Sequence, residues 1–394
     1  MVRGLKGPSP LILLKGFNLV WCLPPDYMHC VLEGVTQQLT DIWVAVKKYK
    51  VKKHLKEVEM RMKQIKPPNS FCRLPRPVKE RKNWKATEWL YWLLYYSLPC
   101  LSGILDESAI NHFALLCQAL FLLLQATVTD ADLQTADQLL SLFLSRVRTV
   151  YDDSVATFNV HQLAHLTKSV EMLGPLWGTS TFPFENGNGM LVKLVTAAQG
   201  VPFQIAERVL MKSWLRTASK FVELPLRLAD LRDRIIGSHS VRETGSVRLL
   251  GAPLKSVSLE QAAVQLFAAW YGEVPSLAHY ARLEVNGTEI HSTRYSRVTK
   301  TCSTCVRMND GLYCMVTDIC SFYSNCQKII LVCQELVTSQ SEFRNVTYIQ
   351  KCKLPPPGRN ICLYSPEDVS AQCVFVNLEH QSYVCDIPNN YKVD

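Results

Sequence analysis

The first 25 residues of this sequence contain neither Asp nor Glu. This absence excludes a carboxylate metal ligand, or a carboxylate acting as acid or base, from that segment. The sequence also lacks a Cys-x2-Cys pair between residues 26 and 161, where Cys72, Cys100 and Cys117 are far apart. A zinc site with two closely spaced thiolates is therefore excluded from this region.

No segment has the length and flanks that predict a membrane-spanning helix or a secretory signal. Residues 89–105 carry no charged side chain, but this run is short for a span, contains Pro99 and lacks a stop-transfer flank. The apolar stretch 11–23 is interrupted by Lys15 and follows no cleavage pattern. We therefore expect no membrane partner, and we interpret residues 89–105 as a buried helix.

The composition is that of a folded globular protein. Of its 394 residues, 48% are hydrophobic, which allows sizeable cores, and the length suggests two or three domains. Ten of the fifteen cysteines fall between residues 302 and 385. In the absence of a secretory signal, so many cysteines argue against a disulfide scaffold.

One segment carries all of the excess positive charge. Residues 47–85 contain fifteen Lys and Arg against three Glu, an excess larger than the net charge of +9 of the whole chain. Clustered Lys and Arg neutralise phosphates and release counterions, which predicts salt-sensitive binding to duplex DNA. The alternative is a solvated helix face over residues 43–66. The candidate DNA-binding residues in this segment are Lys47, Lys48, Lys52, Lys53, Arg73, Arg76, Arg81, Lys82 and Lys85.

Three short stretches form the most informative pattern in the chain. Residues 26–30 read Asp-Tyr-Met-His-Cys, and residues 159–166 contain an H-x3-H pair. Residues 174–189 run from Gly-Pro-Leu-Trp into Phe-Pro-Phe-Glu-Asn-Gly-Asn-Gly. In order and content these stretches resemble the second half of the catalytic core of CACTA (En/Spm) DDE transposases, with a more distant similarity to the V(D)J recombinase lineage. The resemblance extends over residues 1–220.

This resemblance implies an RNase H-like core in which three acids hold Mg²⁺ or Mn²⁺ for phosphodiester cleavage and strand transfer. It assigns Asp26 to the second acid, at the end of a strand, and Glu185 to the third acid, on a helix. The first acid has no counterpart, because residues 1–25 contain no carboxylate. We therefore expect an incomplete active site. The alternative for Asp26 is a turn-forming residue after the two preceding prolines.

The histidine pair and the residues after Glu185 carry further expectations. His161 and His165 are spaced i, i+4, so a helix places both imidazoles on one face, where they could share a zinc ion. Because no close thiolates accompany them, we interpret the pair instead as orienting the region that presents Glu185. Lys193 is a further candidate contact to DNA. The alternative for the Asn-Gly-rich residues 186–189 is a loop that caps an ordinary helix.

The composition and periodicity of the sequence change toward its end. Leu259–Trp270 has a helical pattern, and after residue 280 helical periodicity fades while Val, Tyr, Cys and Thr become frequent. Short strands such as 328–332 and 373–378, separated by turn clusters, predict a small β-rich domain, with a barrel-like form as one option.

The cysteines of this β-rich domain allow two interpretations. Cys302-x2-Cys305 is the close pair, with Cys314 and Cys320 behind it, so a zinc site is conceivable there. The interpretation that we prefer is that buried free thiols fill core positions of the domain.

These patterns predict an α+β chain. We expect an incomplete RNase H-like core, interrupted by a mainly α-helical insertion and followed by the β-rich domain. The expected divisions are 1–45 for the first part of the core, 46–158 for the basic and helical insertion, 159–222 for the return to the core, 223–279 for a helical and loop linker, and 280–394 for the Cys-rich β domain.

Two classes of function follow. In the first, the chain is a DNA-transposition enzyme, or a fragment of one, in which Asp26 and Glu185 bind metal and the basic segment holds DNA. In the second, it is a non-catalytic DNA-associated or protein-interaction protein that keeps the fold and has lost the chemistry. We expect a nuclear protein with duplex DNA as its partner, and homo-oligomers are an open alternative to a monomer.

Overall fold

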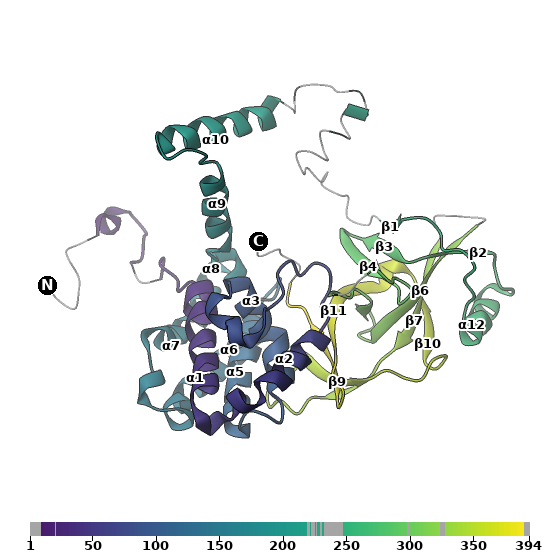
Figure 1. Cartoon of the computed structure of the whole chain (residues 1–394), viewed down its shortest axis with the longest axis horizontal. Coiled ribbons are helices and arrows are strands. Elements are labelled where there is room, and N and C mark those ends of the chain that lie inside the picture. Colours follow the sequence, from purple (N-terminus) through teal and green to yellow (C-terminus); the bar gives the residue numbers. More distant parts are fainter. Residues whose placement is uncertain are drawn as a thin grey trace.

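The computed structural model describes residues 9–19, 21–218, 247–297, 300–323 and 328–389, together with residues 221, 225, 227, 228 and 231. The described chain is helical up to residue 218 and mainly β from residue 247 onward, so the predicted α+β class is confirmed. Figure 1 shows the helical part and the β part side by side, with α9 (Phe182–Lys193) and α10 (Val201–Ala218) projecting away from them.

The helical part contains a long rod near its beginning. The π-helix η2 (Met28–Thr36) continues directly into α1 (Gln37–Ala45), and both bury an apolar face that includes Val31 and Leu39. Short helices precede and follow this rod: η1 (Pro10–Leu13), η3 (Lys47–Tyr49), η4 (Val51–His54), α2 (Leu55–Gln64) and η5 (Val78–Asn83).

The core of the helical part is built from residues 86–150. The uncharged run predicted as a buried helix forms α3 (Ala86–Tyr91), the π-helix η6 (Trp92–Tyr96) and α4 (Ser97–Leu101), and nearly all of it is buried. The long helices α5 (Glu107–Leu123) and α6 (Asp130–Val150) pack against each other. The side chains of Asp106 and Thr129 cap their N-termini, which fixes where each helix begins.

The helical part ends in an exposed arm. The helices η7 (Asp153–Val155), α7 (Phe158–Gln162), η8 (Leu163–His165), α8 (Leu166–Leu173) and η9 (Leu176–Thr179) lead to α9 and α10. No residue of α10 is buried, and Phe203, Leu210 and Trp214 are 81%, 69% and 72% exposed. Apolar side chains that lie this far from any core need a partner surface to be covered.

The predicted position of Asp26 at the end of a strand is wrong. Residues 9–19 and 21–218 contain no strand, and Asp26 directly precedes a helix. Pro24 and Pro25 lack the backbone N–H groups that pair strands, and no described strand lies in residues 9–218 to pair with this segment. The described part of residues 1–45 and 159–222 is therefore helical, and the expected RNase H-like core is not reproduced there.

The β part contains two antiparallel sheets. The larger has nine strands in the order β10-β7-β6-β5-β11-β12-β9-β8, with β2 also paired to β6, and the smaller has the order β1-β3-β4. Their bounds are β1 Val247–Leu250, β2 Leu277–Tyr280, β3 Arg282–Val285, β4 Thr288–His291, β5 Cys305–Met308, β6 Tyr313–Phe322, β7 Ile329–Glu335, β8 Val337–Gln340, β9 Ile349–Lys353, β10 Ile361–Tyr364, β11 Val369–Asn377 and β12 Ser382–Asp386. The helix α12 (Gln261–Tyr271) and the short helix η10 (Pro366–Asp368) complete this part, and the predicted helix at 259–270 is confirmed.

Strand β6 organises the β part because its two halves have different neighbours. Residues 313–315 pair with β5, whereas residues 319–322 pair with β2. The register with β7 shifts between Val316 and Asp318, which marks a bulge and bends the strand. The small sheet covers one face of the large one, and Leu283 and Ile290 pack there against Val316 and Leu331.

The cysteines of the β part form no disulfide among the described residues. Most are fully buried within three apolar clusters. The preferred interpretation of the sequence, in which free thiols fill core positions, is therefore confirmed for Cys305, Cys314, Cys320, Cys333, Cys352, Cys373 and Cys385.

The helical part and the β part share one hydrophobic core. The ring of Tyr348 stacks on Phe121 at 4.3 Å between centroids, and its hydroxyl donates to the carbonyl of Leu94 at 2.9 Å. Gln118 and Thr347 exchange two hydrogen bonds across the same boundary. The main apolar cluster runs from the helices into β9, β11 and β12 without interruption.

Candidate functional site

The carboxylate of Asp26 lies where the helical rod begins. Its Oδ2 accepts a hydrogen bond from the backbone amide of His29 at 3.1 Å and lies 2.6 Å from His29 Nδ1. Residues three apart face each other in the first helical turn, so the spacing of Asp26 and His29 produces this contact. The carboxylate thereby satisfies one of the free amides at the start of the helix.

A second set of contacts joins Asp26 to the stretch around Glu185. Thr181 precedes α9 and donates its backbone amide to Asp26 Oδ1 at 3.1 Å and its hydroxyl to Asp26 Oδ2 at 2.7 Å. Glu185 lies one turn further on, where its amide donates to the Thr181 carbonyl at 3.0 Å. Asp26 is therefore held at the N-terminus of the helix that carries Glu185, where the helix dipole favours a negative charge.

Two opposing effects act on the pKa of Asp26. Burial raises this pKa, but hydrogen bonds from Thr181 and His29 stabilise the ionised carboxylate and outweigh burial, so the pKa lies below its ordinary value of 3.8. The ionised carboxylate is thus already satisfied by protein donors. A metal ion at Oδ2 would have to displace one of those donors, whereas the described contacts of Oδ1 are limited to the Thr181 amide.

The two candidate catalytic acids do not form a complete metal site in the part of the chain that the structure describes. The Glu185 side chain is exposed, whereas the side chain of Asp26 is only 18% exposed. No described trio of His, Cys, Asp or Glu that includes Asp26 or Glu185 has its ligand atoms within 4.8 Å of one another. A Mg²⁺ or Mn²⁺ ion would therefore find at most two protein carboxylates here.

The H-x3-H stretch packs against the same rod. Cys30 Sγ donates to the carbonyl of Asn159 at 3.3 Å. A Cβ atom at Gly34 would lie 2.6 Å from Asn159 Nδ2 and 2.7 Å from the carbonyl oxygen of His29, so a larger residue here would force the rod or the Asn159 side chain to shift. The ring of Tyr27 lies 5.9 Å from that of Phe182. All three stretches singled out in the sequence therefore meet at the rod that begins after Asp26.

The two histidines of this stretch face each other at the surface. Their Nε2 atoms lie 3.4 Å apart, and the ring of His165 also meets Trp21 edge-on at 6.0 Å. The spacing of His161 and His165 thus brings both imidazoles to one face, as predicted. Among the described residues no third ligand joins them within 4.8 Å, so the pair provides only two of the four ligands of a structural zinc.

Most basic candidates are exposed. Lys47 and Lys48 lie on η3, and Lys52 and Lys53 lie on η4. No described carboxylate lies within ion-pairing distance of these four lysines, which we call the lysine cluster. The other exposed basic candidates are Arg73, Lys82, Lys85 and Lys193.

Two arginines of the basic segment have structural roles instead. Arg76 forms a two-point ion pair with Glu88, at 2.8 and 2.7 Å, and the Glu88 side chain is only 1% exposed. Arg81 Nε lies 2.6 Å from Asp41 Oδ1 on the rod. A carboxylate buried without its cation would be strongly destabilising, so Arg76 is held by the fold. The charge of this segment is therefore less available to a ligand than the sequence implies.

The lysine cluster and Asp26 lie at opposite ends of the helical rod. The rod runs from Met28 to Ala45, and Lys47 follows its last turn. At about 1.5 Å of rise per residue, this separation corresponds to roughly 25 Å along the axis.

The zinc site that the sequence made conceivable around Cys302 and Cys305, as the alternative to buried thiols, is not assembled in the described residues. Cys305 pairs with Met315 and Cys314 pairs with Val306, so neighbouring positions of β6 send Cys314 and Met315 to opposite faces of the sheet. Cys305 and Cys314 accordingly belong to different apolar clusters. Side chains on opposite faces cannot share one ion.

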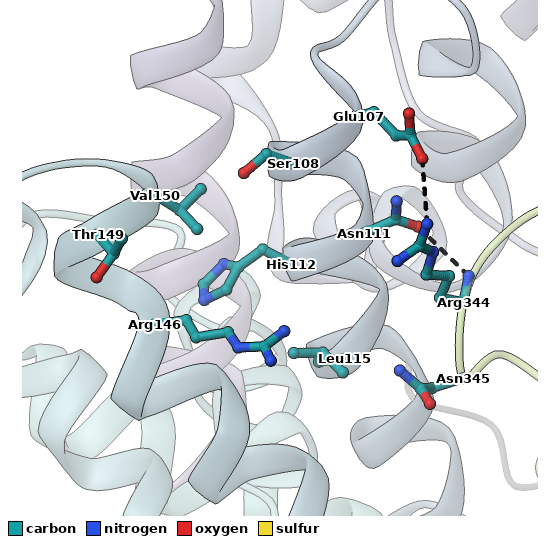
Figure 2. A pocket seen from close by; sticks show the side chains of 10 residues that line it. All are labelled: Glu107, Ser108, Asn111, His112, Leu115, Arg146, Thr149, Val150, Arg344 and Asn345. Carbon is teal, nitrogen blue, oxygen red and sulfur yellow. Dashed lines mark hydrogen bonds and ion pairs between the residues drawn. The ribbon is translucent and has the colours of Figure 1, made fainter.

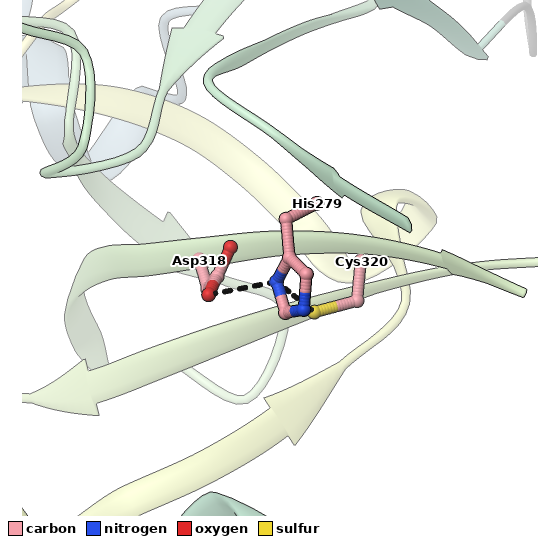
Figure 3. Close-up of side chains that lie close together, drawn as sticks. All are labelled: His279, Asp318 and Cys320. Carbon is pink, nitrogen blue, oxygen red and sulfur yellow. Dashed lines mark hydrogen bonds and ion pairs between the residues drawn. The ribbon is translucent and has the colours of Figure 1, made fainter. Parts of the chain in front are cut away.

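A different group could hold a metal ion. His279, Asp318 and Cys320 are buried, and their ligand atoms lie within 4.8 Å of one another. His279 Nδ1 is 3.0 Å from Asp318 Oδ2 and 3.7 Å from Cys320 Sγ, and Figure 3 shows the imidazole between the other two side chains. Burial raises the pKa of the Cys320 thiol. The Asp-x-Cys spacing at 318–320, within the predicted β-rich domain, is the sequence signal for this group, because strand pairing brings in His279.

A separate pocket of about 470 Å³ lies between α5, α6 and the loop before β9 (Figure 2). Arg344 enters it from the loop, its Nη2 lies 3.6 Å from Glu107 Oε1, and no other described carboxylate lies within ion-pairing distance of it. His112 forms part of the wall, and its Nε2 donates to the carbonyl of Phe143 at 2.9 Å. Burial lowers the pKa of His112 to about 4, so this imidazole is neutral near pH 7.

No protein-family model, curated protein or solved structure matches this chain. None of the described helices combines the length and apolarity that a membrane span requires.

Proposed function

We propose that this chain is a DNA-binding protein of the CACTA transposase type, with an incomplete two-metal site for phosphodiester cleavage and strand transfer. One observation carries the proposal: the three stretches that resemble the transposase core meet at a single helical rod. Asp26 contacts Thr181 at the start of the helix bearing Glu185, and Cys30 contacts Asn159 in the H-x3-H stretch. These contacts support the interpretation of the three stretches as parts of one site.

The chemistry of the proposed site requires more acids than the three stretches provide. Two-metal catalysis stabilises the attacking and the leaving oxygen together, which needs several carboxylates around both ions. Asp26 and Glu185 are the two that the motifs supply. With few anionic ligands Mg²⁺ keeps its water molecules and binds weakly. The machinery is therefore incomplete in this chain, and Mg²⁺ or Mn²⁺ would act only together with a further acid.

The lysine cluster is the surface that we assign to duplex DNA. Four exposed ammonium groups on two adjacent short helices have no described carboxylate partner, and such groups neutralise phosphates without reading sequence. Arg76 and Arg81 are left out of this surface because carboxylates of the protein already hold them. Arg73, Lys82, Lys85 and Lys193 remain as secondary contacts, and a nuclear location follows from the same partner.

The separation along the rod sets a length for the bound DNA. A duplex rises about 3.4 Å per base pair, so DNA that touches both the lysine cluster and Asp26 must span roughly 7 base pairs. Duplexes much shorter than this would bind the lysines alone.

A filter-binding titration of the whole chain with duplex DNA, repeated over a range of salt concentrations, tests the proposal. We expect affinity for any sequence that falls steeply with salt. Changing Lys47, Lys48, Lys52 and Lys53 together to Gln should flatten the slope of log K against log salt by about 3 to 4. The matched control changes four exposed lysines elsewhere, Lys212, Lys255, Lys300 and Lys353, to Gln. Equal slopes in both variants would contradict the proposed surface.

The exposed arm favours self-association as a part of this proposal. Leu210, Met211, Trp214 and Leu215 line an apolar hollow on α10 that no other described element covers. A symmetric pair of such helices presents the same apolar face to each other, which is how most homodimers form. The alternative, a non-catalytic protein-interaction module derived from a transposase, would use the same face for a different protein.

A further inference from the structure

Strands β2 and β6 place three metal-ligating side chains on one face of the β part. Side chains alternate along a strand, so Asp318 and Cys320 point the same way, and the register sets His279 directly opposite Cys320. All three are deeply buried, with 2%, 0% and 8% of Asp318, Cys320 and His279 exposed. Buried carboxylates and imidazoles of this kind are either paired or bound to a metal.

The two separations from His279 Nδ1 are close to those of a tetrahedral zinc site, and the third pair of ligand atoms lies within 4.8 Å. With Zn–N near 2.0 Å, Zn–O near 2.0 Å and Zn–S near 2.3 Å, tetrahedral angles put N and S about 3.5 Å apart and N and O about 3.3 Å apart. The observed separations from His279 Nδ1 are 3.7 Å to Cys320 Sγ and 3.0 Å to Asp318 Oδ2. Shifts of a few tenths of an ångström would therefore seat the ion.

We propose that His279, Asp318 and Cys320 bind one Zn²⁺ ion in the β part of this chain. The donor set selects the metal, because a thiolate with an imidazole and one carboxylate suits zinc, whereas Mg²⁺ and Ca²⁺ require oxygen ligands. Three protein ligands leave the fourth tetrahedral position to a water molecule.

Arg294 fixes the carboxylate for this role. Its Nε lies 2.9 Å from Asp318 Oδ2, and its Nη2 donates to the carbonyl of Ser258 at 2.9 Å. Groups that hold a ligand carboxylate in place are usual around metal sites. In the described structure, Asp318 Oδ2 contacts both Arg294 Nε and His279 Nδ1. When zinc binds, Oδ2 keeps its contact with Arg294 and binds the ion in place of His279 Nδ1.

Zinc binding changes the protonation of two groups. The Cys320 thiol loses its proton to solvent and binds as thiolate, and the His279 imidazole binds through Nδ1 while carrying its proton on Nε2. The Nδ1 to Oδ2 hydrogen bond is replaced by two bonds to the metal. One proton is released from sulfur for each ion bound.

The ion would anchor the edge of the sheet. In the described structure β2 pairs only with β6, and it follows α12, so zinc shared between the strands holds both elements to the sheet. This anchoring role is independent of DNA. The zinc site can therefore be tested independently of the proposed DNA-binding function.

Metal content of the purified whole chain, measured by inductively coupled plasma mass spectrometry, tests the site. We expect about one zinc ion per chain. Cys320→Ala and Asp318→Asn should reduce this to near zero. Cys333→Ala is the matched control, because Cys333 is equally buried on the neighbouring strand β7 and belongs to no such trio. It should keep its zinc.

Cobalt substitution gives a second readout that does not depend on a variant folding well. Co²⁺ added to the metal-stripped wild-type chain should produce the near-ultraviolet absorption of a thiolate bound to cobalt, and Cys333→Ala should produce it too. Cys320→Ala should not. A wild-type chain that contains no zinc and gives no cobalt–thiolate absorption would overturn the proposal and leave the trio as a hydrogen-bonded network.

Discussion

Thr181 binds the Asp26 carboxylate through both its amide and its hydroxyl, at 3.1 and 2.7 Å, although 155 residues separate the two positions. This contact joins the start of the helical rod to the start of α9. Because the same carboxylate also meets His29, it is a junction for two helix N-termini. The arrangement stabilises the fold whether or not a metal ion ever binds there.

Removing the hydroxyl of Thr181 should destabilise the fold. In Thr181→Val the Asp26 carboxylate loses one donor, so we expect the free energy of unfolding in urea to fall by about 1 to 2 kcal/mol at neutral pH. Because the pKa of Asp26 is lower in the folded chain than the ordinary value of 3.8, the ionised carboxylate stabilises the fold at pH values above 3.8. This contribution disappears as the pH falls through the pKa of Asp26 in the folded chain. The effect of the variant should therefore shrink in acid.

A matched control for this variant is Thr217→Val on α10. Its hydroxyl donates only to the carbonyl of Ser213 one turn earlier. We expect a change within about 0.5 kcal/mol. Equal losses in the two threonine variants would show that the contact with Asp26 contributes nothing.

Arg76 should affect stability rather than DNA binding. Arg76→Gln leaves the buried Glu88 carboxylate without its cation, so we expect a loss of about 3 kcal/mol in the free energy of unfolding. The salt dependence of DNA binding should stay as in the wild type, measured under conditions where the variant is folded. A flatter salt slope would return Arg76 to the DNA-binding surface.

The chain alone should not cut or join DNA. We expect no nicking of supercoiled plasmid and no strand transfer of labelled duplex ends in Mg²⁺ or Mn²⁺, because Asp26 and Glu185 are the only acids that the motifs supply. Agarose and sequencing gels measure both reactions. Cleavage that disappears in Asp26→Asn and in Glu185→Gln would refute the incomplete site and establish an enzyme.

Stability should fall as the pH drops from about 6.5 to about 4, in part because of His112. Burial lowers the pKa of His112 to about 4, so within this window the unfolded chain takes up a proton that the folded chain does not. The slope attributable to His112 is at most about 1.4 kcal/mol per pH unit. His112→Gln should flatten the curve of unfolding free energy against pH. Asn111→Ala, on the same helix and without a titrating group, should leave its slope unchanged.

The apolar face of α10 should determine whether the chain is a dimer or a monomer in solution. We expect a dimer by size-exclusion chromatography with light scattering, and a monomer for Leu210→Glu combined with Trp214→Glu. Lys212→Ala, on the opposite side of the helix, serves as the control. A wild-type chain that is monomeric at all concentrations would remove self-association from the proposal.

Periodicity and composition predicted the fold class and several elements. The uncharged run before Leu105 is a set of buried helices, and the alternating segments at 328–332 and 373–378 lie in β7 and β11. The prediction of a strand before Asp26 was wrong, because strand formation depends on partner strands that the local sequence does not reveal. The core shared between the two parts was not predicted either, since contacts such as Phe121 with Tyr348 join positions far apart in sequence.

The candidate sites show the same division. The spacing of His161 and His165 correctly predicted that the imidazoles meet, because helical geometry is local. The ion pairs of Arg76 and Arg81 could not be predicted from the sequence, since the carboxylates that hold them come from α3 and from the rod. The trio at His279 was missed for a similar reason. Only the register between β2 and β6 brings that histidine to Asp318 and Cys320.

The stacking of Tyr348 on Phe121 has a consequence for the independence of the two parts. Domains that fold alone have their own core and meet at comparatively polar interfaces, whereas here the boundary is apolar and Tyr348 and Tyr383 belong to the core of the helical part. A truncation that removed the β part would strip one wall from that core and expose Phe121 to water. The helical part is therefore expected to lose stability when it is produced without the β part.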